Sequence, residues 1–317
     1  MWDLLHEAAS AGGLATAVAT GYLCSTDADT KATAIDLLGV VGEFHPDQRD
    51  LVISTLANLG AATRAGNEAG VARALGRTGS DSAIGLLIRL ADHPEAGVRR
   101  EVANALSQAM WADYQDEGVR ALIQLTRDVD PEVRNRATFA LGWQVAVDGV
   151  DVRAALWERT SDTYDEARAE GIRGLARRRD PRAVPLVAEL LLEGEAHLLT
   201  FDAARFLAAP ELVPLLAAYD LMEFGVAEAL QECDPAARLR QDNLAWKVFN
   251  EVHARRPDLP IALYNERFET GIYLAVAPIG EPATIWWPVE SLLERASDDP
   301  VWAAELACID VDLAMIE

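Results

Sequence analysis

Apolar residues recur at helical spacing along roughly the first two thirds of the chain. The clearest example is residues 128–142, which carry one stripe at positions i, i+4, i+7 and i+8, formed by Val133, Ala137, Ala140 and Leu141. Pro131 suits the first turn of a helix because its missing N–H has no partner there, and Asp130 can cap the free N–H groups. Gly142 follows the stripe and is predicted to end the helix.

This helix is the second of a pair, and the pair recurs along the chain. Val119, Leu122 and Ile123 form a stripe on the preceding helix, and a turn at Val129-Asp130 joins the two. The last leucines of the candidate second helices follow one another at steps of 37, 31, 35, 34 and 32 residues: Leu38, Leu75, Leu106, Leu141, Leu175 and Leu207. Such a period, built from paired helices, is typical of an α-solenoid, in which each pair buries its stripe against its neighbours.

Several further helices follow from the same pattern. Residues 2–23 predict one or two helices broken at Gly12-Gly13, and the stripe Leu14, Val18, Tyr22 on this segment indicates an N-terminal cap. The remaining segments are 29–59 with a break at 45–47, 66–79, 81–92 with 95–108, 117–127 with 131–141, 150–160 with 164–177, and 181–192 with 196–208. Residues 210–219 begin another helix, which Pro214 is expected to bend or end.

After about residue 220 the repeat fades. Helical patterns continue at 223–232 and 235–255, β-prone segments follow at 261–264, 271–277 and 284–287, and helices return at 288–297 and 300–308. A fully helical alternative, with loops at 257–287, stays open. We therefore predict a mostly α protein: a right-handed α-solenoid of stacked antiparallel helix pairs over residues 1–220, and an acidic C-terminal cap with a small β element over residues 221–317.

Two central repeats share a spacing of acid and base. Asp128 stands six residues before Arg134, and Asp162 six before Arg168, with an apolar residue preceding each arginine; Arg99 follows His93 at the same distance. This pattern resembles HEAT repeats, and more narrowly the HEAT-like repeats of phycobilisome lyases, over about residues 1–220. The resemblance implies a ladder of turn acids and helix arginines in the centre of the solenoid. It leaves the activity open, because this scaffold carries unrelated functions.

The charge of the chain restricts its partners. Its 317 residues carry 51 acidic and 28 basic side chains, a net charge of −23, which opposes nonspecific binding to nucleic acid or to an anionic membrane. Residues 183–317 alone hold 24 acids and 8 bases. The three widely spaced cysteines fit a reducing cytoplasm, no signal peptide or transmembrane span is expected, and 26 arginines against 2 lysines fit a bacterial coding bias.

The familiar signatures of catalysis are missing from the sequence. No histidine is followed by a metal ligand at i+3 or i+4, and neither a Gly-rich phosphate loop nor Gly-x-Ser-x-Gly occurs. HEAT-repeat iron hydroxylases of the deoxyhypusine type repeat a His-Glu pair across units, whereas here it occurs once, at His6-Glu7. We therefore predict no catalytic residue, cofactor or metal, and favour a protein that is not an enzyme.

Two groups of side chains are candidate contacts for a partner. The first is one local basic cluster, which either complements the carbonyl end of a helix or anchors an acidic segment: Arg173, Arg177, Arg178, Arg179 and Arg182. The second lies near the C-terminus. Adjacent residues on a strand point to opposite faces, so one of Trp286 and Trp287 has no place in a small core. Tyr264, Phe268 and Tyr273 accompany this pair, while Trp111, Trp143 and Trp157 of the repeats serve either packing or an aromatic patch.

Three functions are compatible with these observations. The leading hypothesis is a non-enzymatic HEAT-like scaffold that binds a protein partner along one long face. The second is an acidic inhibitor or immunity-type protein that mimics nucleic acid and neutralises a basic partner. The third, implied by the resemblance alone, is an enzyme of the phycobilin lyase type. The identity of the partner and the oligomeric state, including a homodimer through the Trp-rich end, stay open.

Overall fold

The computed structural model describes residues 2–61, 66–110, 116–194, 196–266, 271–277 and 284–314. By its internal contacts the chain divides into two compact units, Met1–Val187 and Ala188–Glu317. The boundary that we predicted at residue 220 marks the point where the repeat pattern fades, and it stays a proposal.

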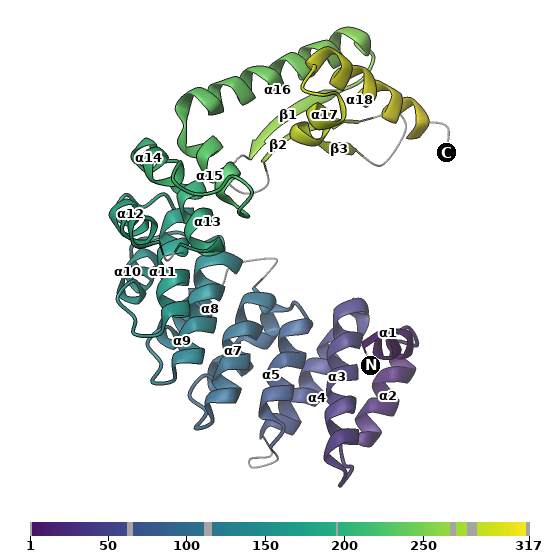
Figure 1. Ribbon diagram of the computed structural model, residues 1–317. Coiled ribbons are helices and arrows are strands. Elements are labelled where there is room, and N and C mark those ends of the chain that lie inside the picture. Colours follow the sequence, from purple (N-terminus) through teal and green to yellow (C-terminus); the bar gives the residue numbers. More distant parts are fainter. Residues whose placement is uncertain are drawn as a thin grey trace. The chain divides into compact units, whose positions relative to one another are not determined.

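The described residues of the first unit are mainly helical (Figure 1). The helices are α1 (Trp2–Ala9), α2 (Gly13–Tyr22), α3 (Ala28–Phe44), α4 (Arg49–Ala61), α5 (Glu68–Arg77), α6 (Ile84–Leu90), α7 (Ala96–Ala109), α8 (Asp116–Leu125), α9 (Pro131–Phe139), α10 (Val150–Arg159), α11 (Asp165–Arg177) and the first residues of α12 (Ala183–Glu193). The second helices α3, α5, α7, α9 and α11 pack side by side in a row, and the first helices α4, α6, α8 and α10 pack against them. The predicted pairs are confirmed.

Capping explains why the reference helix begins where it does. Pro131 occupies the first turn of α9, and the carboxylate of Asp130 accepts hydrogen bonds from the backbone N–H of Glu132 at 2.9 Å and of Val133 at 3.1 Å. The stripe then points inward, because Val133, Ala137, Ala140 and Leu141 are all fully buried.

Small residues beside the last leucine of each second helix allow consecutive second helices to touch. The residue after one leucine meets the residue before the next, as in the pairs Gly39 with Ala74, Gly76 with Ala105, and Gly142 with Gly174. A Cβ added to Gly76 would lie 2.6 Å from the Cα of Ala105, far inside van der Waals contact. A Cβ at Gly76 therefore fits only if one of the two helices shifts.

Two sequence predictions about helix ends are wrong. Gly142 does not end its helix, since α9 continues through a π-helical turn, Ala140–Gln144, in which Gly142 is buried against Gly174. Glycine is needed there for close approach and not for termination. Pro214 neither bends nor ends a helix: after a 3-10 turn at Pro210–Leu212, it occupies the first turn of α14 (Val213–Leu216), where its missing N–H needs no partner.

The acid–base ladder runs between repeats. Arg99 donates two hydrogen bonds of 2.7 Å to Asp128 of the next repeat, and Arg134 donates two of 2.8 Å to Asp162. Each arginine also donates to a carbonyl of its own turn, that of His93 for Arg99 and that of Asp128 for Arg134. The ladder thus ties each second helix to two successive turns.

The end of the ladder differs from its centre. Arg168 pairs at 3.1 Å with the exposed Asp165 of its own helix. Asp162 is the most enclosed acid of the ladder, with a side chain only 2% exposed. The hydrogen bond from Arg134 lowers the pKa of Asp162 to about 2, against the opposing effect of its burial.

The second unit joins further helices to a small sheet. It contains α13 (Leu198–Leu207), α14, α15 (Val226–Cys233), α16 (Pro235–Arg255), β1 (Ile261–Glu266), β2 (Gly271–Val276), β3 (Ile285–Pro288), α17 (Val289–Arg295) and α18 (Pro300–Ala314). The strands are antiparallel in the order β1-β2-β3. The predicted β element is confirmed, and the fully helical alternative is wrong. These segments form strands because they are rich in β-branched and aromatic residues.

The register of the sheet assigns its two faces. Leu263 pairs with Leu274, which pairs with Trp287, and these residues pack on a core contributed by α16, α17 and α18. Tyr264 pairs with Tyr273 on the opposite face. One face of the sheet is therefore the floor of the hydrophobic core, and the other bears tyrosines.

We expect the substitution Gly76→Ala to lower the free energy of unfolding by about 1–3 kcal/mol, because its Cβ overpacks the contact with Ala105. Urea unfolding measures the difference. The matched control is Gly85→Ala on α6, where no heavy atom lies within 4 Å of an added Cβ. That variant should be unchanged or up to about 1 kcal/mol more stable. Equal effects of the two substitutions would contradict the close contact.

We expect Asp162→Asn to lower the free energy of unfolding by about 3 kcal/mol at neutral pH, because it breaks the enclosed ion pair with Arg134. The folded pKa of about 2 lies below the unfolded value of 3.8, so the ionised carboxylate contributes about 2 kcal/mol above pH 4. This contribution is lost as the pH falls towards 2, and the two proteins should converge there. Urea midpoints at neutral and acidic pH test this, with the exposed Asp165→Asn as a control that changes little.

Candidate binding surfaces

The centre of the basic cluster is a buried arginine. The side chain of Arg178 is 6% exposed and donates hydrogen bonds to the carbonyls of Leu141 at 2.8 Å, Gly142 at 2.9 Å and Val147 at 2.7 Å. These carbonyls lie at and after the end of the preceding second helix. Burial lowers the pKa of the Arg178 guanidinium to about 10, so it stays charged at neutral pH. Arg178 thus complements the carbonyl end of a helix, which is one of the two roles considered for the cluster. The helix belongs to the neighbouring repeat.

Three other arginines of the cluster lie over tryptophan rings. The guanidinium of Arg173 lies 3.7 Å from the ring centroid of Trp143, and that of Arg177 lies 5.0 Å from it. Arg182 pairs with Asp180 at 2.7 Å and lies over Trp157. The partner contact predicted at Arg177, Arg178 and Arg179 stays a prediction; Arg179 is exposed, whereas Arg178 is enclosed. Trp111 lies outside the described residues.

The outer face of the C-terminal sheet carries an exposed aromatic pair. Tyr264 is 43% exposed and Trp286 is 50% exposed, and their ring centroids are 4.8 Å apart. Tyr273 joins them because it pairs directly with Tyr264 across β1 and β2. We call Tyr264, Tyr273 and Trp286 the aromatic face. Phe268, which the sequence placed near this group, lies outside the described residues.

The two adjacent tryptophans separate as predicted. Trp286 lies on the aromatic face, whereas Trp287 packs against the core and donates its indole N–H to Asp310 at 3.2 Å. Trp287 is thus a partly buried residue with a satisfied polar atom, and Trp286 is the more exposed of the two. The partner contact predicted at both tryptophans stays a prediction.

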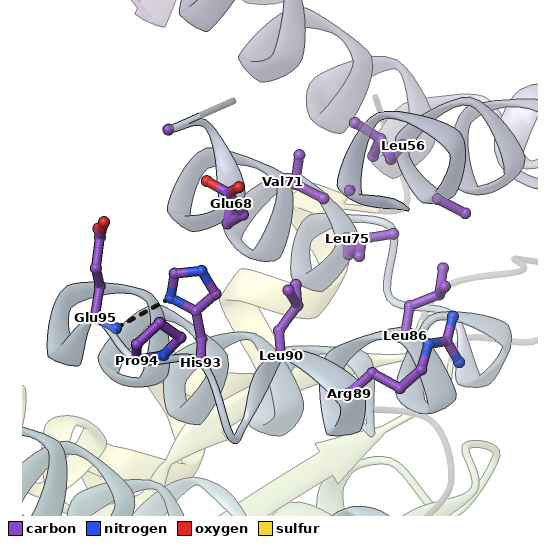
Figure 2. Close-up of a pocket in the computed structure, with 13 residues that line it drawn as sticks. Leu56, Glu68, Val71, Leu75, Leu86, Arg89, Leu90, His93, Pro94 and Glu95 are labelled. Atoms are coloured by element: carbon purple, nitrogen blue, oxygen red, sulfur yellow. Dashed lines mark hydrogen bonds between the residues drawn. The ribbon is translucent and has the colours of Figure 1, made fainter. Parts of the chain in front are cut away.

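A pocket of about 670 Å³ lies among α4, α5, α6 and the turn before α7 (Figure 2). Its apolar wall comes from the three consecutive helices α4, α5 and α6: Leu56, Val71, Leu75, Leu86 and Leu90. Glu68, His93 and Glu95 lie together at one end, and His93 Nδ1 accepts a hydrogen bond of 3.2 Å from the Glu95 backbone N–H. An apolar pocket with a polar end suits one side chain of a partner or a small ligand.

Sequence reasoning missed this pocket. Its one local signal was His93, which stands where the central repeats have aspartate. Among the described residues, no three His, Cys, Asp or Glu side chains gather so that they could hold a metal ion. None of the helices within the described residues is both long enough and apolar enough to span a membrane.

The stacked helix pairs and the ladder between them define a helical repeat protein of the α-solenoid class. Residues 66–142 and 119–208 match the family model of HEAT repeats, so this stretch of the chain consists of HEAT repeats. The resemblance noted in the sequence is confirmed at this level.

Two comparisons lead to the same relative. The chain is 33% identical to protein YibA of Escherichia coli strain K12 over 120 residues, which are 38% of this chain and 41% of YibA. The match thus spans less than half of that relative's length. The X-ray structure of E. coli YibA superposes with a TM-score of 0.55 at 23% identity, covering 70% of this chain and 81% of that one. This likeness shows the fold alone.

A further solved structure, the complex of CpcE and CpcF of phycocyanin lyase from Nostoc, is 17% identical to this chain. The superposition covers 69% of this chain and 86% of the other chain, with a TM-score of 0.45. The score is too low to support any inference about activity.

We expect Arg178→Met to lower the free energy of unfolding by at least about 2 kcal/mol, because the buried carbonyls of Leu141, Gly142 and Val147 lose their donor. Arg127→Met is the control, since its ion pair with Glu158 is exposed on both sides and contributes no more than about 1 kcal/mol. Thermal and urea unfolding measure the stability of both variants. An Arg178 variant as stable as the control would show that these carbonyls find other donors.

Proposed function

We propose that this protein is a non-enzymatic scaffold of HEAT repeats that binds a basic protein partner through the aromatic face of its C-terminal sheet. The observation that carries the proposal is the exposed pair Tyr264 and Trp286. Tyrosine and tryptophan are enriched at the centres of protein interfaces, where burying them against a partner supplies much of the binding energy. Here the opposite face of the same sheet is committed to the core, so the outer rings are held on a rigid support.

The charge of the unit selects the chemistry of the partner. Residues 188–317 contain 24 acidic and 8 basic side chains. A surface with this excess attracts cationic segments and speeds their association. Arginine and lysine also bind over the faces of tryptophan and tyrosine rings. An Arg- or Lys-rich segment therefore satisfies both features, with its cations over the aromatic face and its net charge complementary to the unit.

A second function, the acidic inhibitor or immunity-type protein, shares this surface and is favoured by the same excess of charge. The two functions differ in their effect on the partner. A scaffold leaves the partner active while it is bound, whereas an inhibitor covers the partner's own basic site. The phycobilin lyase hypothesis gains no support beyond the resemblance that raised it, and the cytoplasmic and bacterial assignments stay predictions from the sequence.

The binding test uses the full chain and a displayed library of random peptides. Peptides selected by the wild-type protein should be enriched in arginine and lysine, and their affinity, measured by fluorescence anisotropy, should fall as salt is raised. We expect Trp286→Ala to weaken binding at least about tenfold, because it removes the centre of the contact. A basic protein that competes with the selected peptides for binding then separates the two functions. If this protein keeps its own activity while bound, the scaffold is supported, and if it loses that activity, the inhibitor is supported.

The matched control is Trp302→Ala. Trp302 is similarly exposed and lies on α18, in the helix layer that packs against the opposite face of the sheet. The Trp302→Ala variant should bind the selected peptides with the affinity of the wild type. Selection of neutral or acidic peptides, or an unchanged affinity in Trp286→Ala, would contradict the proposal.

A further inference from the structure

The pocket beside α5 lies where the acid–base ladder changes its residues. In the central repeats the ladder arginine stands seven residues before the last leucine of its helix, as Arg99 does before Leu106. The same position before Leu75 is occupied by Glu68, the first residue of α5. The turn acid that such an arginine would meet in the next repeat is replaced by His93, six residues before Arg99. This pair of the ladder therefore has a carboxylate in place of the guanidinium and an imidazole in place of the carboxylate.

The carboxylates at this end of the pocket have no cation beside them. Glu68 and Glu95 both line the pocket, and among the described residues neither carboxylate makes a hydrogen bond or an ion pair. By contrast, the ladder acid Asp128 accepts two hydrogen bonds from Arg99. Because Nδ1 of His93 accepts a hydrogen bond from the Glu95 N–H, that nitrogen carries no proton and the ring adds no positive charge. The polar end of the pocket is therefore negative.

The rest of the pocket is an apolar cavity with room for a small molecule. Its volume is about 670 Å³, and Leu86 and Leu90 of α6 are only half-buried, so they present apolar surface to it. Sites for small ligands have volumes of roughly 300–1,000 Å³, with apolar walls and a few polar groups that fix the orientation of the ligand. A single side chain of a protein partner would leave much of this volume unfilled.

Arg89 determines which way a charged ligand lies. In Figure 2 it is at the opposite end of the pocket from Glu68 and Glu95. Its guanidinium donates a hydrogen bond of 2.9 Å to the carbonyl of Gly85 in its own helix, and among the described residues it pairs with no carboxylate. Its positive charge repels a cation at that end and so directs the cation towards the two carboxylates.

We propose that this pocket binds a small amphiphilic cation, with its apolar body among α4, α5 and α6 and its protonated amine between Glu68 and Glu95. The amine supplies the positive charge that Arg99 and Arg134 supply at the equivalent position of their own repeats. The same carboxylates repel a fatty acid or any other anion with a similar body. This site lies in the first unit, and its occupation does not depend on the aromatic face of the C-terminal sheet.

Calorimetric titration of the full chain with octylamine, octanol and octanoate tests the inference, because these probes share one alkyl chain and differ in charge. We expect protonated octylamine to bind at least about fivefold more tightly than octanol, and octanoate not to bind. Hexylamine is two CH₂ groups shorter and should bind about tenfold more weakly than octylamine. No binding of octylamine, or equal binding of octylamine and octanol, would overturn the proposal.

Two variants locate the site. Glu68→Gln combined with Glu95→Gln should weaken octylamine binding at least about fivefold and leave octanol binding unchanged. Ala57→Phe places a ring in the pocket from α4 and should weaken the binding of both probes. The control combines Glu7→Gln with Glu166→Gln, which removes the same charge at exposed positions outside the pocket. This control should bind octylamine with the affinity of the wild type.

Circular dichroism and thermal unfolding confirm that each variant is folded. An equal loss of octylamine binding in the control and in the variant of Glu68 and Glu95 would overturn the proposal, because the amine would then respond only to the net charge of −23. Octylamine binding that neither the pocket carboxylates nor Ala57→Phe affects would overturn it as well, since the amine must then lie elsewhere on the protein.

Discussion

Direct contact between the second helices of consecutive repeats is the constraint on which the solenoid depends. Gly76 against Ala105, and Gly142 against Gly174, bring two helix backbones so close that no larger side chain fits. The leucine beside each contact is then sealed from water, which supplies the main stabilising free energy of the repeat. The paired helices have no other way to bury these stripes.

The polar network is built on this close packing. Arg134 can reach Asp162, and Arg178 can reach the carbonyls of Leu141 and Gly142, only because neighbouring repeats approach so closely. In return, the network satisfies backbone carbonyls and turn acids that the packing has removed from water. Buried charges contribute little net stability when they are paired, but they penalise any slip in register, because a slipped pair leaves a charge uncompensated.

The chain separates its structural surfaces from those available for binding. In the C-terminal unit, β-strand alternation sends Trp287 into the core and leaves Trp286 beside Tyr264 on the outer face. In the first unit, helical periodicity sends Ala15 and Ala19 of α2 inward and leaves Leu14 and Val18 outside. In both places one element contributes one face to the core and exposes apolar side chains on the other.

The sequence by itself determined what is local and periodic: the start of α9 at Asp130 and Pro131, the spacing of the leucines, the strands and the opposite directions of Trp286 and Trp287. These follow from backbone geometry within a few residues. Only the tertiary structure decided that Arg99 pairs with Asp128 of the next repeat, that Gly142 serves packing, that the α2 stripe faces outward, and that the pocket beside His93 forms. Each depends on residues brought together from separate repeats, and the period of a repeat does not specify which face of one unit meets its neighbour.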